Sequence, residues 1–413
     1  YIVRLECTSV AGFFEGKSVF ITGVTGFLGK ALLEKLLYTC NGIDKIYVLL
    51  RPKKGLSPAE RVQNISNSLV FQRLKSNRPE DLNKIIPVTG DLSAPGLGLS
   101  AKDEEALLNN VSVVFHSAAT VKLNEPLRVA VAINLEGTIK VLALCKRMQN
   151  IRAFVYVSTA YTNTDQQVVE ERVYPPPASI DAVYKFLREH GDDEEATKRF
   201  LNGRPNAYCF SKSLAEAYLV EHHGDVPIVI LRPSIVVAAR SEPLAGWVDA
   251  WQGNTIALAN TARGFLRVVI CDAKVVADLI PLDYVVNMAI VSAVHSKQFF
   301  SDKVPFPGAV MTRSPIKFAV GSFCLQTVPA YVLDAWRMVK RKRNKCMYIL
   351  RDFTAFFTTH RWVMRSGGAC ALAEALSDAD ARLFPCHPAH VHWPSYMPVY
   401  YRGVKEFLCG GKN

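Results

Sequence analysis

Short apolar runs alternate with helical patterns over the first 235 residues of the chain. The runs have the length and β-branched content of buried strands, and the segments between them repeat apolar residues with the period of a helix. Such alternation predicts an α/β fold, in which right-handed crossovers wind a parallel sheet on both faces. The predicted strands are Ser18–Thr22, Lys45–Leu50, Ile85–Thr89, Ser112–Phe115, Ala153–Ser158 and Pro227–Leu231. The predicted helices are Leu28–Tyr38, Pro58–Leu74, Pro126–Met148 and Ala207–His222.

Two stretches depart from this alternation. Residues 165–205 contain Tyr174–Pro177 and the acidic run Asp192–Glu195, and they predict a loop-and-helix excursion on the side of the sheet where ligands bind. Beyond Val294, helical segments separated by proline and glycine replace the alternation. We therefore predict two domains, 1–295 with the sheet and 296–413 mainly helical, with a boundary accurate to about 10 residues.

Three glycines, Gly23, Gly26 and Gly29, follow the first predicted strand and precede a predicted helix. In a Rossmann-type, doubly wound sheet, such glycines allow a tight turn, the approach of the backbone to a pyrophosphate, and close packing of helix on strand. The helix N-terminus adds a favourable field for phosphate. The stretch predicts a dinucleotide site, and the alternative is a tight turn without a ligand.

Tyr208 and Lys212 lie four residues apart in a predicted helix and share one face. A lysine ammonium beside a phenol favours the phenolate and is expected to lower the pKa of Tyr208 from its usual value near 10. Such a tyrosine can give a proton to a carbonyl oxygen while hydride reaches the carbon. Ser158 and Thr159 end the preceding strand and are placed to hydrogen-bond the same oxygen. The alternative is a tyrosine–lysine pair at a helix surface.

Arg51 follows the second predicted strand, where an acidic residue normally holds the adenosine 2′-hydroxyl. Arginine there, with Lys53 and Lys54 nearby, suits a 2′-phosphate and favours NADPH over NADH, whereas a solvated basic loop is the alternative. Asp91 is expected to accept from the adenine amino group. Arg232-Pro233-Ser234 follows a strand and is expected either to shape the nicotinamide and acyl side of the pocket or to be purely structural.

The charge of the chain is uneven: the net charge is +12, and the segment from Lys297 onward carries 17 Lys and Arg against 7 Asp and Glu. A basic C-terminal part indicates an anionic surface or ligand, and the absence of a nucleic-acid motif argues against nucleic acid. The ten cysteines contain no Cys-x-x-Cys and are expected to be reduced thiols.

Phe318–Leu333 is a 16-residue stretch without charge, shorter than the roughly 20 apolar residues that span a bilayer. Arg337 and the basic cluster Lys340–Lys345 follow it. This combination fits a helix lying on an anionic membrane surface, and equally an amphipathic packing helix with a solvated charge run. Cys386, His387, His390 and His392 are close in sequence but fit no standard zinc spacing, so we expect no metal.

Many segments resemble the extended short-chain dehydrogenase/reductase superfamily and, within it, the fatty acyl-CoA reductases of animals and plants. The resemblance is continuous over about residues 12–293. It is carried by TGVTGFLGK, VLLRPKKG, GDLSAPGLGLS, VFHSAATVKLNEPL, VYVSTAYTN, VEERVYPPP, NAYCFSKSLAE, LRPSIVVAARSEPLAGWVDAWQG and ADLIPLDYVVN. VPAYVLDAWRM, FTTHRWVM and LFPCHPAHVHWPSYMPVYYRGVKEFL are similar to the family's C-terminal domain.

The resemblance implies reduction of a long-chain fatty acyl-CoA to the primary alcohol through an aldehyde, with two NADPH consumed and CoA released. It also implies a cytosol-facing membrane location, at the endoplasmic reticulum or peroxisome, and an asparagine, Asn134, that supports the active-site lysine. The residues expected to be catalytic are Ser158, Thr159, Tyr208 and Lys212. The residues expected to bind the cofactor are Thr22, Gly23, Thr25, Gly26, Phe27, Leu28, Gly29, Arg51, Asp91, Leu92, Ala118, Ala119, Asn134, Tyr208, Lys212, Pro233 and Ser234.

Two rival functions stay open at this point: another extended reductase, acting on a steroid, a sugar nucleotide or a carrier-bound thioester, and a catalytically impaired NADP-binding protein associated with membranes. The stretch between about Val294 and Pro305 is shorter than the family's pattern, and the family commonly continues beyond this C-terminus with an apolar anchoring segment. We therefore expect the sequence to be a fragment, a splice form or the translation of a flawed gene model.

Overall fold

The computed structural model describes residues 9–53, 55–263, 266, 269–270, 277–295, 311–312, 360 and 362–410. Contacts divide the chain into two compact units. The first unit comprises Tyr1–Pro233, Leu282–Asp302 and Met364–His390, and the second comprises Ser234–Pro281, Lys303–Val363 and Val391–Asn413. The units interleave along the chain, whereas the predicted domains are consecutive, and the boundary near residue 295 stays a prediction. Lys54, the apolar stretch 318–333 and the basic residues 337–345 lie outside the described residues.

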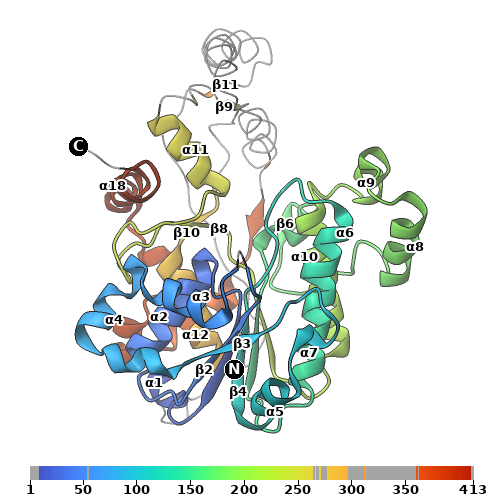
Figure 1. Ribbon diagram of the computed structural model, residues 1–413. Helices are drawn as coiled ribbons and strands as arrows, with labels where there is room; N and C mark the ends of the chain where they lie inside the picture. The colour runs from blue at the N-terminus through green and yellow to red at the C-terminus, as the bar shows by residue number, and fades with distance from the viewer. Residues whose placement is uncertain are drawn as a thin grey trace. The chain divides into compact units, whose positions relative to one another are not determined.

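The first unit is built on a six-stranded parallel sheet with the order β3-β2-β1-β4-β5-β7 (Figure 1). Its strands are β1 Ser18–Thr22, β2 Ile46–Leu50, β3 Ile85–Thr89, β4 Val111–His116, β5 Ala153–Val157 and β7 Ile228–Leu231. All six predicted strands are therefore confirmed to within a residue at each end. The strand order reverses between β1 and β4, and in open α/β sheets the crevice at such a point takes the ligand.

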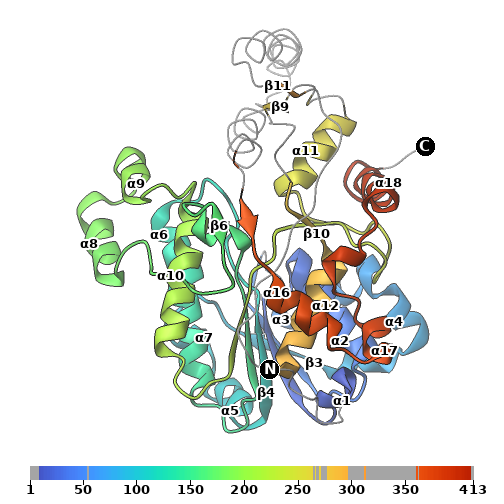
Figure 2. The same ribbon diagram turned by 180° about the vertical axis from the view of Figure 1, so that it is seen from behind.

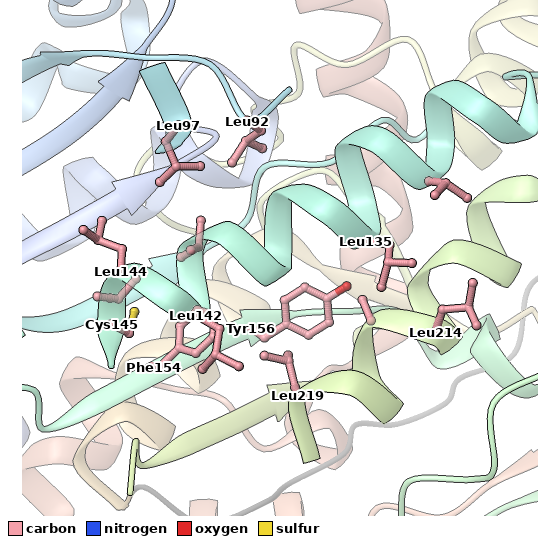
Figure 3. Packing of buried hydrophobic residues seen from close by; sticks show 14 of the residues in the cluster. Leu92, Leu97, Leu135, Leu142, Leu144, Cys145, Phe154, Tyr156, Leu214 and Leu219 are labelled. Atoms are coloured by element: carbon pink, nitrogen blue, oxygen red, sulfur yellow. The ribbon is translucent and has the colours of Figure 1, made fainter. Parts of the chain in front are cut away.

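Helices cover both faces of this sheet. Helices α2 (Phe27–Thr39) and α12 (Leu282–His295) lie on one face, and α7 (Gly137–Cys145) and α10 (Ala207–His222) lie on the other (Figures 1 and 2). Figure 3 shows the core on the second face, where Phe154 and Tyr156 of β5 lie against leucines of the two helices. Full burial of each such side chain contributes about 1.5–3 kcal/mol, which fixes the position of α10 on the sheet.

Two long predicted helices are interrupted. The helix predicted over 58–74 is split into α3 (Pro58–Ser66), η1 (Leu69–Phe71) and α4 (Gln72–Asn77). The reason is local, because the Ser68 hydroxyl donates to Ile65 O at 2.6 Å and ends the first piece. The helix predicted over 126–148 is continuous in direction but consists of α6 (Leu127–Ala130), the π-helical turn η4 (Val131–Glu136) and α7. Such turns are common at functional sites.

The remaining elements of the first unit are short. They are α1 (Val10–Phe13), η2 (Pro79–Lys84), η3 (Pro95–Gly98), α5 (Ala101–Asn110), η5 (Ala160–Asn163), β6 (Val168–Val169), α8 (Ile180–His190), α9 (Glu194–Phe200), α16 (Gly367–Glu374), α17 (Asp378–Leu383) and η7 (Pro388–His390). Helices α8 and α9 form the predicted excursion within residues 165–205, and they project beyond α10 (Figure 1).

Residues 364–390 belong to the fold of the first unit although they lie far along the chain. The Lys35 ammonium on α2 donates to Leu383 O at 2.7 Å, and the Asp380 carboxylate accepts the Val10 N–H at 3.1 Å. The Asn287 amide on α12 donates to Pro385 O at 2.9 Å. The late segment thus covers the face that α2 and α12 form.

The second unit pairs β8 (Ile235–Val237) with β10 (Leu279–Pro281) in parallel, and β9 (Val269–Ile270) with β11 (Met311–Thr312). Helices α11 (Gly253–Ala262) and α18 (Trp393–Gly403) follow, with the π-helical turn η8 (Val404–Leu408), while β12 (Val363–Met364) falls where the two units meet in sequence. The Tyr396 hydroxyl donates to Ala238 O at 2.6 Å. A Cβ on Gly403 would lie 2.6 Å from the Gly246 carbonyl carbon, so α18 needs glycine there.

Within the described part of the chain, no helix has the length and apolar character that crossing a membrane requires.

Candidate active site

The glycine loop lies between β1 and α2 and requires two of its three glycines on steric grounds. Gly23 has φ of +81°, and a Cβ there would lie 2.6 Å from the Ala118 nitrogen. A Cβ on Gly29 would lie 2.8 Å from the Gly23 carbonyl carbon and closer still to its oxygen. Gly26 begins α2 without a side-chain cap, and a Cβ there would meet only Gly23 O, at 3.2 Å. Because no side chain caps α2 at Gly26, the first backbone N–H groups of the helix are available to bind a phosphate.

A buried hydrogen-bond chain joins β1 to β4 behind this loop. The Thr22 hydroxyl lies 2.6 Å from His116 Nδ1, and His116 Nε2 lies 3.1 Å from the Thr138 hydroxyl. The Ala118 N–H donates to the Thr22 hydroxyl at 3.3 Å. Burial lowers the pKa of His116 to about 3, with Lys212 adding to the effect, so the imidazole is neutral. These hydrogen bonds hold the loop against Ala118, and the adjacent Ala119 is half-buried.

An open cavity of about 550 Å³ lies at the ends of β2 and β3. Arg51, Lys53, Gly90 and Asp91 are among its lining residues. The Arg51 guanidinium lies 3.3 Å from Asp91 Oδ2, while Asp91 Oδ1 accepts the Ser93 N–H at 2.9 Å. Partial burial raises the pKa of Asp91, but the bonds from Ser93 and Arg51 outweigh it and bring the pKa below its usual value. The Asp91 carboxylate is therefore charged at the place where an adenosine half would bind, and the residues present fit a dinucleotide.

The side chain of Leu92 follows this cavity and does not line it. Leu92 belongs to the buried core, and a Cβ on Gly137 of α7 would lie 3.1 Å from its own Cβ. The Leu92 side chain therefore packs against α7 and holds this helix close to the loop after β3.

Helix α10 brings Tyr208 and Lys212 to the end of β5. The Asn206 side chain caps the helix by accepting the Cys209 N–H at 2.9 Å, which explains why the helix begins as predicted. The Lys212 ammonium donates to Val157 O at 2.7 Å and lies 4.4 Å from the centre of the Tyr156 ring. Lys212 is thereby held at the strand end next to Thr159.

The pKa of Tyr208 differs from the expectation. Burial is the largest influence and raises it above the usual value, Cys209 and Glu216 raise it further, and a hydrogen bond with Thr159 works in the opposite direction. The expected lowering by Lys212 is wrong for this structure, because desolvation of the phenol dominates although Tyr208 keeps some accessible surface. Tyr208 is therefore protonated at neutral pH, which suits a proton donor.

The two strand-end hydroxyls have different partners. Thr159 lies close enough to Tyr208 to lower the pKa of its phenol, and the Thr159 hydroxyl accepts the Tyr161 N–H at 3.3 Å. The Ser158 hydroxyl is buried and donates to the Glu216 carboxylate by a short bond. Thr159 therefore lies beside the Tyr208 phenol, while the Ser158 hydroxyl is bound to Glu216, and the catalytic roles of both hydroxyls stay predictions.

Asn134 lies in the π-helical turn η4 and is buried. Its amide oxygen accepts the Thr120 N–H at 2.9 Å, and its amide nitrogen donates to the Ser211 hydroxyl at 3.0 Å. Ser211 precedes Lys212, so Asn134 fixes the loop after β4 to the helix that carries the lysine. The role of Asn134 in supporting Lys212 stays a prediction.

Arg232 forms a buried ion pair with Glu216, which sequence reasoning missed. Arg232 Nε donates to Glu216 Oε1 at 2.9 Å, and a second, short bond joins the other pair of atoms. Of the two expectations for Arg232, the structure favours the structural one. Pro233 O accepts the Ala160 N–H at 3.0 Å, and Ser234 begins the second unit, so their roles in binding stay predictions.

Among the described residues, no group of three or more His, Cys, Asp and Glu is arranged to hold a metal ion. His387 stacks on His390 with ring centres 4.7 Å apart, and His387 Nε2 lies 3.3 Å from a Glu374 carboxylate oxygen. The absence of a metal from the chemistry stays a prediction.

The parallel sheet, the glycine loop at its switch point and the Thr159–Tyr208–Lys212 group define an extended short-chain dehydrogenase/reductase. Solved structures share this fold. The terminal R domain of the myxalamid PKS-NRPS pathway has a TM-score of 0.59 at 21% identity, with 87% of this chain and 85% of that one covered. UDP-glucuronic acid 4-epimerase from Bacillus cereus, in complex with NAD, has a TM-score of 0.54 at 15% identity, with 95% and 99% covered.

The chain belongs to the fatty acyl-CoA reductase family. Two family models described as male sterility protein match it, the NAD-binding model over residues 21–289 and a second over 325–410. Human fatty acyl-CoA reductase 1 is 32% identical over 97% of this chain and 86% of that protein. Fatty acyl-CoA reductase 2 of Mus musculus is 31% identical, again over 97% and 86%. The protein is thus an oxidoreductase that uses a nicotinamide cofactor.

Proposed function

We propose that the protein reduces a long-chain fatty acyl-CoA to the primary alcohol with two NADPH. The observation that carries the proposal is the grouping of Thr159, Tyr208 and Lys212 at the end of β5, on a sheet whose glycine loop fits a dinucleotide. Family membership supports the thioester as the substrate, because the matched relatives are fatty acyl-CoA reductases.

The bound cofactor supplies a hydride in each of two reductions. In the first, hydride adds to the thioester carbon and Tyr208 gives its proton to the oxygen, with Thr159 beside the same phenol. The hemithioacetal hydroxyl then returns its proton to the Tyr208 phenolate as the C–S bond breaks, which leaves an aldehyde, and the released CoA thiolate takes a proton from water. In the second reduction, hydride adds to the aldehyde carbon and its oxygen takes a proton from Tyr208. Lys212 stabilises the charge that Tyr208 acquires and binds the nicotinamide ribose hydroxyls.

The substrate test is product analysis by mass spectrometry after incubation with NADPH and a ladder of acyl-CoA chain lengths. We expect fatty alcohol, with two NADPH oxidised for each alcohol formed. Turnover with no acyl-CoA of any length would refute the proposal and favour a catalytically impaired NADP-binding protein. Turnover only with a steroid, a sugar nucleotide or a carrier-bound thioester would assign the chain to another reductase activity.

The choice of NADPH over NADH rests on Arg51. Its guanidinium lines the cavity after β2 and is more than half exposed, within reach of a 2′-phosphate. We expect Arg51→Ala to weaken NADPH binding about 10- to 150-fold, the equivalent of a charged hydrogen bond of about 1.5–3 kcal/mol, and to leave NADH binding unchanged. Fluorescence titration of both cofactors measures this. Arg147→Ala, which removes a surface arginine paired with Glu104, is the control; an equal loss in both variants would rule out the assignment.

The membrane location is a separate proposal, based on the basic sequence after Lys297. We expect the protein to sediment with vesicles that contain phosphatidylserine and not with neutral vesicles, and to be released by salt, because screening weakens the attraction. A variant with Lys340, Arg341, Lys342 and Arg343 changed to alanine should lose binding. Equal binding to both kinds of vesicle would contradict an electrostatic surface association at the endoplasmic reticulum or peroxisome.

A further inference from the structure

We propose that Glu216, fixed in place by Arg232, is a positioning residue that keeps Lys212 as an ammonium beside Tyr208. The proposal rests on the proposed function for the role of Lys212. It adds a carboxylate and its arginine partner to the catalytic group, and it connects that group to the C-terminal part of the chain.

The geometry of α10 places the three side chains in one row. Tyr208, Lys212 and Glu216 are spaced by four residues, so they lie one above another on the face that meets the sheet. Glu216 is 1% exposed and Lys212 is 2% exposed. Glu216 accepts bonds from Arg232 and Ser158, and Lys212 donates to Val157 O, so the carboxylate acts on the ammonium through its charge across one helical turn. Burial reduces the screening of that charge by water.

The surroundings of Lys212 are otherwise unfavourable to its charge. Around it are the neutral His116 from β4 and the Tyr156 ring and Val157 O from β5, and Tyr208 lies one turn away on its own helix. Tyr156 reaches between α7 and α10 (Figure 3), and burial raises its pKa, so its phenol is neutral. Burial lowers the pKa of Lys212 to about 7, and the charge of Glu216 acts against this lowering. Without Glu216, the described neighbours would offer the ammonium a ring face and one carbonyl oxygen.

Arg232 fixes the carboxylate from the other side. Its guanidinium holds both oxygens of Glu216, and its remaining nitrogen donates to Arg172 O at 3.0 Å. The same Glu216 oxygen that accepts Arg232 Nε also accepts the Ser158 hydroxyl. This explains why a serine at the strand end points away from Tyr208: it completes the hydrogen bonds of the carboxylate.

The loop that holds Arg232 is itself tied to the late segment of the chain. The Glu171 carboxylate accepts the N–H groups of Gly368 at 2.6 Å and Ala369 at 3.2 Å, at the start of α16. The Arg365 N–H donates to Val169 O at 2.8 Å. Hydrogen bonds therefore connect residues 365–369 to residues 169–172. Arg232 is hydrogen-bonded to that second segment and, through its other nitrogens, to Glu216.

The test is Glu216→Gln, which keeps the shape and removes the charge. Lowering the pKa of Lys212 by one unit reduces its charged fraction about tenfold at pH 8 and less than twofold at pH 5.5. We therefore expect the alkaline limb of the kcat profile for acyl-CoA reduction to move about one unit toward lower pH. Competitive acetylation of Lys212, followed by mass spectrometry across pH, should show the same shift without depending on turnover.

Three variants complete the test. Glu216→Asp keeps the charge and should leave the alkaline limb of the kcat profile within about 0.3 pH unit of its wild-type position. Glu216→Gln combined with Arg232→Met removes both charges and avoids an unpaired buried arginine, so it provides a folded protein if the single variant unfolds. Glu171→Gln weakens the hydrogen bonds to the start of α16. It should reduce kcat but move the alkaline limb of the kcat profile less than Glu216→Gln does.

Two results would overturn the proposal. One is a folded charge-free variant whose rate falls equally at all pH values. The other is a Lys212 acetylation profile that does not move. If the proposed function is wrong, the result is different: the wild-type protein would turn over no acyl-CoA, while the Lys212 acetylation profile would still shift between variants.

Discussion

Tyr208→Phe should reduce kcat for acyl-CoA reduction by about 10²- to 10⁴-fold, the range that a positioned proton donor contributes. The phenol is protonated because burial raises its pKa, and Thr159 lies beside it. Phenylalanine fills the same space without the proton, so folding should be unchanged and cofactor affinity should fall far less than kcat. Steady-state rates of NADPH oxidation and a fluorescence titration of NADPH measure the two quantities.

Tyr218→Phe is the matched control, since Tyr218 lies on the same helix and stacks on His222 with ring centres 4.0 Å apart. It should keep the full rate. A Tyr208→Phe protein that retains more than about a tenth of kcat would show that another group supplies the proton.

Gly29→Ala should abolish dinucleotide binding and destabilise the protein. The added Cβ would lie 2.8 Å from the Gly23 carbonyl carbon, and both groups are backbone, so the loop itself must move. Overpacking of this kind costs about 1–3 kcal/mol, and the displaced loop would no longer fit a pyrophosphate. We expect affinity for NADPH to fall by more than about 100-fold, equivalent to about 2.7 kcal/mol, with a lower free energy of unfolding in urea.

Two neighbouring variants separate these effects. Gly26→Ala meets only Gly23 O at 3.2 Å, so it should weaken cofactor binding with little loss of stability. Gly16→Ala has open space around it but a φ of +64°, so it should cost stability and leave cofactor affinity intact. Unchanged NADPH affinity in both Gly26→Ala and Gly29→Ala would mean that the loop is a turn without a ligand.

The strands could be predicted closely because each is centred on a short apolar run rich in β-branched residues. Helix α10 was equally readable, since Asn206 caps it and the apolar pattern continues to its end. The π-helical turn at Val131–Glu136 could not be predicted, because its hydrogen-bond pattern differs from that of an α-helix by one residue. The contact of Asn134 in this turn with Ser211 on α10 joins two elements and was equally unpredictable. The packing of residues 364–390 on α2 also could not be predicted, because an amphipathic pattern does not specify which surface a helix covers.

The candidate site was predictable where spacing within one element carries the information, as for Tyr208 with Lys212 and for the glycine loop. Glu216 is a further member of the same series at the next turn, so the spacing was available and could have identified it. Its partner Arg232 and the divergence of Ser158 from Thr159 depend on contacts between elements. The raised pKa of Tyr208 likewise reflects how deeply the phenol is surrounded, which a sequence does not state.

The interleaving of segments has a consequence for recombination between relatives. A chimaera that joins residues 1–295 of this chain to a foreign C-terminal part would replace Leu383 and Asp380, and so change the partners of the 4%-exposed Lys35 and of Val10. It would also break the match between Gly246 and Gly403. Exchanges meant to transfer substrate preference should instead keep residues 364–390 with their own sheet and move residues 391–410 together with residues 234–281. Such an experiment should exchange compact units, because a consecutive range of residues does not correspond to one unit.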